Sequence, residues 1–124
     1  MKAIENAVEI LEKNNLSNKC SKAAPCKYFI SSGLYLNDGF TLLPIYLIEI
    51  NSRLYFADFG MTVRSFQDAF DASDENTRSL AEATLAKLGT TLDEQNLNME
   101  LDSDILQCYN NFVMSIMFLQ ALFA

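Results

Sequence analysis

The residues best suited to chemistry are carboxylates beside glycine turns. Asp38 lies within an Asn-Asp-Gly turn, and Asp58 lies in the segment 55–62, whose pattern predicts a strand running into a helix. A carboxylate at the end of a strand can act as a general acid or base, and Arg64 would supply a cation nearby. One hypothesis is therefore a small-ligand or enzymatic module, with a cleft near Asp58 that Asp38 and Arg64 also line.

The same segment has a structural explanation, which we favour. Asp58 can accept backbone N–H groups of the turn, Gly60 can supply a positive φ, and Thr62 or Gly60 can cap the helix that follows. All three residue types are then explained without a ligand. Asp102 and Asp104 lie beside a predicted helix start, where carboxylates usually act as caps rather than as metal ligands.

The chain contains no histidine, which removes most catalytic and metal-binding arrangements. Ser-His-Asp and Cys-His pairs cannot be built, and neither can zinc sites that use imidazole. Three cysteines cannot supply four thiolates. The four glycines are widely spread and match no nucleotide-binding loop. We therefore expect a protein that is not an enzyme and that holds no metal and no cofactor.

Cysteine usage favours a cytoplasmic protein. Five residues separate Cys20 from Cys26, which is not the spacing of a redox motif, and the odd count with Cys108 is atypical of a secreted disulfide scaffold. Free thiols are the simplest interpretation, and a Cys20–Cys26 disulfide is the alternative. The N-terminus lacks the apolar core of a signal peptide. The longest apolar run, residues 112–124, is too short to span a membrane, so we expect a soluble protein.

Charge is distributed unevenly along the 124 residues, whose net charge is −7. Residues 1–64 are nearly neutral, whereas residues 65–124 hold ten acidic groups and two basic ones, a net charge of −8. This balance argues against direct nucleic-acid binding and permits a protein partner with a basic surface. A solvated face is the ordinary alternative. The carboxylates proposed to bind the partner are Asp68, Asp71, Asp74, Glu75, Glu82, Asp93 and Glu94.

Hydrophobic periodicity predicts a sheet in the first half of the chain. The predicted strands cover residues 27–32, 45–50, 53–58 and, later, 97–101. The middle two form an antiparallel hairpin around Asn51 and Ser52. A loop is expected over residues 16–26.

Helices are predicted at both ends and through the second half of the chain. The first covers residues 2–14, and the others run from residue 60 or 62 to about 70, from 74 to about 88, and from 104 to 123. Ser73 or Asp74 caps the third helix, Gly89 ends it, and Asp102 or Ser103 caps the last. Together these elements predict one α+β domain over residues 1–124, a small antiparallel sheet of about four strands packed by helices.

The C-terminal helix is the most apolar segment of the chain. Beyond Asn111 apolar residues occupy nearly every face, which predicts burial all round. The sheet would cover one face of this helix. The other faces would be covered by the remaining helices, by a second subunit or by a further domain. Met114, Met117 and Phe118 suit adaptable contacts with a partner. A structural homodimer through residues 105–124 is the alternative to core packing.

Three stretches resemble the DUF1828 family, a bacterial and phage domain of unknown function. They are the hairpin and turn over residues 53–66, the paired helices with the Leu-Gly at 88–89, and the terminal helix from about 104. Of the turn motif of that family, only Asp58 and Gly60 carry over. The resemblance implies a prokaryotic or phage origin, often in a mobile element, and no catalytic residue.

The leading hypothesis is a non-catalytic protein-interaction module of bacterial or phage origin. Its acidic half or its apolar helix would dock on a protein partner. In the phage version it would be an anti-CRISPR-like inhibitor, whose carboxylates occupy the basic nucleic-acid channel of a host defence protein. Neither nucleic acid nor membrane is expected to bind directly.

Overall fold

One open antiparallel sheet of six strands organises the protein in the computed structural model, which describes residues 2–14 and 19–123. The order of the strands across the sheet is β1-β2-β3-β4-β6-β5. Their bounds are β1 (Lys19–Ala24), β2 (Lys27–Ser31), β3 (Tyr46–Ile50), β4 (Arg53–Ala57), β5 (Thr91–Asp93) and β6 (Asn96–Glu100). The helices are α1 (Lys2–Asn14), α2 (Met61–Arg64), α3 (Gln67–Ala72), α4 (Glu75–Lys87) and α5 (Ile105–Phe123). The predicted α+β class is confirmed, with six strands rather than about four.

The hairpin predicted from two strand patterns around Asn51 and Ser52 is confirmed as β3 and β4. Asn51 and Ser52 have φ values of 52° and 67°, so both central residues are left-handed, as a type I′ turn requires. Such a turn matches the twist of the flanking strands and sets their register. Ile50 therefore lies opposite Arg53, and Tyr46 lies opposite Ala57.

Two strands were missed because they lack an apolar pattern. The loop predicted over residues 16–26 is wrong for 19–24, which form β1, whereas 16–18 lie outside the described residues. Most of β1 is exposed and polar, with an irregularity between Lys22 and Ala24, as is common in edge strands that avoid further pairing. The three residues of β5 at the opposite edge are too few to show an alternation.

The helix predicted to run to about residue 70 is two short helices. Gly60, with φ 78°, precedes α2, so the cap at Thr62 is wrong and the one at Gly60 is correct. Phe66 leaves the helical conformation, with φ −135° and ψ 39°, and separates α2 from α3. This break turns the Phe66 ring onto Phe123 of α5, with ring centroids 5.4 Å apart. Tertiary packing has overridden the local helical pattern here.

Helix α4 has the predicted ends. The Asp74 carboxylate accepts the N–H of Thr77 (2.8 Å), and Gly89 follows the helix with φ 81°. The N–H of Thr90 then donates to the carbonyl of Leu85 (2.9 Å), which closes a Schellman motif. In α5 the predicted cap is wrong by one or two residues, since Asp104 accepts the N–H of Gln107.

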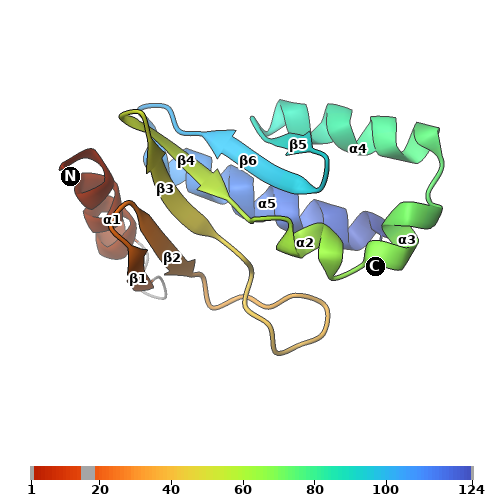
Figure 1. Ribbon diagram of the computed structural model, residues 1–124, viewed down its shortest axis with the longest axis horizontal. Coiled ribbons are helices and arrows are strands. Elements are labelled where there is room, and N and C mark those ends of the chain that lie inside the picture. The colour runs from red at the N-terminus through yellow and green to blue at the C-terminus, as the bar shows by residue number, and fades with distance from the viewer. Residues whose placement is uncertain (1, 15–18, 124) are drawn as a thin grey trace.

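Helix α5 lies against one face of the sheet, as Figure 1 shows behind β4 and β6. The Phe56 ring of β4 contacts the rings of Tyr109 and Phe112, with centroids 5.9 and 5.6 Å apart. Helices α1, α2 and α4 also contact α5. The buried apolar side chains join in one core cluster between the helices and this inner face of the sheet.

The prediction that α5 is buried all round is wrong for one narrow stripe. Its exposed residues follow helical spacing at Gln107, Asn110, Met114, Met117 and Ala121. The sheet and the neighbouring helices cover the other faces, and none of them reaches this stripe. The C-terminal half of the stripe is therefore an apolar surface without a cover.

The length of α5 corrects the expectation that the most apolar segment is too short to span a membrane. The helix has 19 residues and is long and apolar enough to cross a membrane by those two criteria alone, unlike the run of thirteen considered above. Phe112, Ile116 and Leu119 are nevertheless fully buried against the sheet and helices. The core helix of a soluble protein meets the same criteria, so the structure is consistent with a soluble protein.

Candidate functional site: a groove beside helix α5

Asp58 is completely buried, and its side chain is a hydrogen-bond acceptor for backbone N–H groups. Its carboxylate accepts the N–H groups of Gly60 (2.9 Å), Thr62 (3.2 Å) and Leu97 (2.8 Å). Burial raises the pKa of this carboxyl, and the hydrogen bonds from Thr62, Gly60 and Leu97 oppose that rise. The turn explanation given for Asp58 and Gly60 is confirmed, with the contact to β6 as an addition that the sequence did not indicate.

The other residues of the hypothetical cleft are placed elsewhere. The exposed carboxylate of Asp38 accepts the N–H groups of Phe40 and Thr41, both at 2.9 Å. A hydrogen bond from the Thr41 hydroxyl, together with these two backbone bonds, lowers the pKa of Asp38. Arg64 is exposed and lines a shallow polar hollow beside Gly60, which Asp58 does not line. No group of three or more cysteine or acidic side chains in the described ranges could hold a metal ion.

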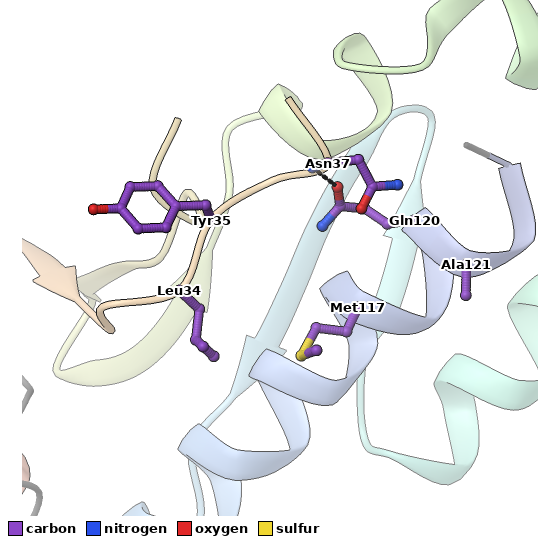
Figure 2. Close-up of a pocket in the computed structure, with 6 residues that line it drawn as sticks. All are labelled: Leu34, Tyr35, Asn37, Met117, Gln120 and Ala121. Atoms are coloured by element: carbon purple, nitrogen blue, oxygen red, sulfur yellow. Dashed lines mark hydrogen bonds between the residues drawn. The ribbon is translucent and has the colours of Figure 1, made fainter. Parts of the chain in front are cut away.

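A hollow with a largely apolar lining lies between α5 and the connection from β2 to β3. Its volume is about 300 Å³. Figure 2 shows the side chains that line it, which are Leu34, Tyr35, Asn37, Met117, Gln120 and Ala121. We call this hollow the α5 groove.

The wall of the α5 groove is held by hydrogen bonds. Within the connection, Tyr35 and Leu42 form an isolated antiparallel bridge. The N–H of Asn37 donates to the side-chain carbonyl of Gln120 at 2.6 Å, the dashed line in Figure 2. Gln120 is buried, so its amide ties the connection to α5. The position of the polar Gln120 within the apolar run was the sequence signal for this contact, although its partner Asn37 could not be predicted.

The groove exposes apolar side chains from both of its walls. Leu34 is 42% exposed, Tyr35 53% and Met117 51%, and Met114 lies one helical turn before Met117 with 54% exposed. Of the three α5 residues proposed to contact a partner, Met114 and Met117 are therefore on the surface. Phe118 is half-buried and packs against the core.

The seven proposed carboxylates are all exposed, and the structure spreads them over three regions. Asp68 and Asp71 are on α3, beside the C-terminal end of α5 (Figure 1). Asp74, Glu75 and Glu82 belong to the start and body of α4. Asp93 is the last residue of β5, and Glu94 is in the turn that follows it. Asp71 also accepts a hydrogen bond from Gln67, and Asp74 caps α4.

The known proteins add no further information about this surface. No family model, curated protein or solved structure matches the chain. The resemblance to DUF1828 therefore stays a prediction.

Proposed function

We propose that the chain is a non-catalytic protein-interaction module whose docking site is the α5 groove. The observation that carries the proposal is that Leu34, Tyr35 and Met117, each more than 40% exposed, line one hollow. Met114, exposed one turn earlier on α5, extends the apolar surface beyond it. Flexible thioethers and an amphipathic ring on one surface are typical of sites that accept an apolar side chain of a partner. An uncovered apolar patch is otherwise a liability for a protein in water.

The partner that fits this site carries an apolar anchor flanked by lysine or arginine. Asp68 and Asp71 of α3 lie beside the C-terminal end of α5, so they form an acidic rim at that end of the helix, where they would meet basic residues of the partner. A basic nucleic-acid-handling protein, as in the anti-CRISPR hypothesis, has this chemistry. We place the module in the cytoplasm, because Cys20, Cys26 and Cys108 are free thiols.

The experiment is affinity capture from the native host with two matched charge insertions. Met117→Glu places a carboxylate in the groove, and Leu80→Glu places one on α4, where the side chain is 57% exposed. A partner of the groove is retained by the wild type and by Leu80→Glu and is lost with Met117→Glu. With that partner purified, Met117→Glu should raise Kd at least about tenfold, since it buries an unpaired charge.

Salt dependence tests the acidic rim separately. The double variant Asp68→Lys with Asp71→Lys should weaken binding at low salt, and the difference from the wild type should shrink at high salt. Equal capture by the wild type and Met117→Glu would exclude the groove. Binding that is insensitive to salt would exclude the basic partner.

A further inference from the structure

The outer face of the sheet, opposite α5, carries apolar and aromatic side chains at its centre, where an antiparallel sheet usually turns polar side chains to water. Residues in register share a face, and two rows cross the centre of this one. The first row is Lys27, Ile48, Tyr55 and Glu100, on β2, β3, β4 and β6. The second row, on the same strands, is Phe29, Tyr46, Ala57 and Asn98.

Phe59 extends this face from the turn after β4. Its φ of 55° is left-handed, an unusual and strained conformation for a bulky aromatic residue. The strain holds a ring that is 42% exposed against Tyr46, with centroids 5.1 Å apart. Tyr46 also contacts Phe29, at 5.3 Å. A strained residue that presents a ring to solvent indicates a surface with a use.

The two ends of the first row carry opposite charges. The Lys27 ammonium lies over the rings of Phe59 and Tyr46, 4.3 and 5.0 Å from their centroids. It has no carboxylate partner in the part of the chain that the structure describes, where the ion pair of Arg53 with Glu100 is the only one. Glu100 closes the other end of the row, and its side chain is 48% exposed.

We propose that the outer face of the sheet binds a second copy of this chain, as a face-to-face dimer. The two-fold axis runs parallel to the strands, between β3 and β4. This surface is separate from the α5 groove and from the homodimer through residues 105–124. Aligned sheets of this kind pack about 10 Å apart with an angle of about 30°.

The rows are complementary to themselves under that axis. Rotation reverses the order of the strands and keeps each row opposite itself, as a two-fold interface requires. Lys27 then faces Glu100 of the second copy, and Ile48 faces Tyr55. In the second row, the large Tyr46 faces the position of the small Ala57, whose side chain is already buried, and Phe29 faces Asn98. The unpaired Lys27 ammonium thus gains the Glu100 carboxylate of the second copy, which also keeps its ion pair with Arg53.

The other face-to-face two-fold axis, perpendicular to the strands, is disfavoured by charge. It would place β2 over β2, so the Lys27 groups of the two copies would meet on one side of the interface. Glu100 would likewise face the same strand of its partner. Like charges at an interface are unfavourable, so the electrostatics select the axis parallel to the strands.

Sedimentation velocity of the purified chain tests the surface. We expect a dimer for the wild type. Ile48→Glu should raise the dimer Kd by about 100-fold, because it buries two unpaired carboxylates. Met117→Glu, in the α5 groove, should leave the dimer unchanged. Circular dichroism of Ile48→Glu should match that of the wild type, because the Ile48 side chain is on the outer face and not in the core.

A charge swap tests the orientation. Lys27→Glu and Glu100→Lys should each weaken the dimer by about tenfold, and the double variant should restore most of the affinity. A wild type that is monomeric at its highest soluble concentration would overturn the proposal. So would a dimer that Met117→Glu dissociates and Ile48→Glu does not. A double variant as weak as the single ones would overturn the axis.

Discussion

The N–H of Leu97 donates to the carboxylate of Asp58, 39 positions earlier in the chain, at 2.8 Å. The N–H of Asp58 donates in return to the carbonyl of Leu97 at 3.2 Å. This exchange joins the end of β4 to β6, while the same carboxylate accepts the N–H groups of Gly60 and Thr62. One buried side chain therefore determines both where the chain leaves the sheet and which strand pairs there.

Replacing Asp58 by Asn should destabilise the protein even though it removes a buried charge. The amide has one oxygen, whereas both carboxylate oxygens accept N–H groups, so an NH₂ group must face a backbone donor. We expect the free energy of unfolding to fall by about 2 kcal/mol, measured by urea denaturation. The exposed Asp38→Asn is the matched control and should cost less. Equal losses for the two variants would contradict the role given to Asp58.

The pH dependence of stability should carry the signature of Asp58. Burial raises its pKa above the ordinary value of 3.8, so the folded state holds a proton more strongly than the unfolded state. The contribution of this group to stability is therefore present at low pH and is lost as the pH rises through the folded pKa. We therefore compare the free energy of unfolding of the wild type with that of Asp58→Asn at each pH. The difference, wild type minus variant, should fall as the pH rises through the folded pKa of Asp58. A difference that rises with pH would show that the hydrogen bonds outweigh burial.

The cysteines should differ strongly in reactivity. Burial, with a smaller effect of Glu12, raises the pKa of Cys20 to about 11, and burial also raises the pKa of Cys108. At pH 8 only about one Cys20 side chain in a thousand is then present as the thiolate. Cys26 is exposed in the turn between β1 and β2, so a thiol reagent should label it first. Mass spectrometry after brief labelling should find one fast site, which Cys26→Ser removes. A fast site that survives this change would contradict the assignment.

Adjacent positions on α5 should respond differently to truncation. Ile116 is fully buried, so Ile116→Ala should lower the free energy of unfolding by about 3 kcal/mol. Met117 is 51% exposed, and Met117→Ala should change it by less than about 0.5 kcal/mol. Thermal or urea denaturation measures both. A large loss at Met117 would mean that the outer stripe of α5 is part of the core and is not free for a partner.

Structural features that a few neighbouring residues specify were predicted correctly. Asn51 and Ser52 mark a hairpin because their left-handed backbone suits a two-residue turn. Asp74 and Gly89 mark the ends of α4 because capping involves only the adjacent backbone. The missed or shifted features are the ones that such signals do not describe. Phe66 breaks a helix to reach Phe123, and β1 pairs through its backbone without an apolar pattern.

The α+β class, the hairpin and the lack of imidazole chemistry follow from the amino-acid sequence, because they depend on composition and on local backbone preferences. Long-range packing, in contrast, encloses the Asp58 carboxylate between Leu97 and its own turn and brings Gln120 to the wall of a groove. It also decided which stripe of α5 stays bare. These contacts join residues far apart in the chain, and no local preference specifies which distant backbone group a buried carboxylate or amide will meet.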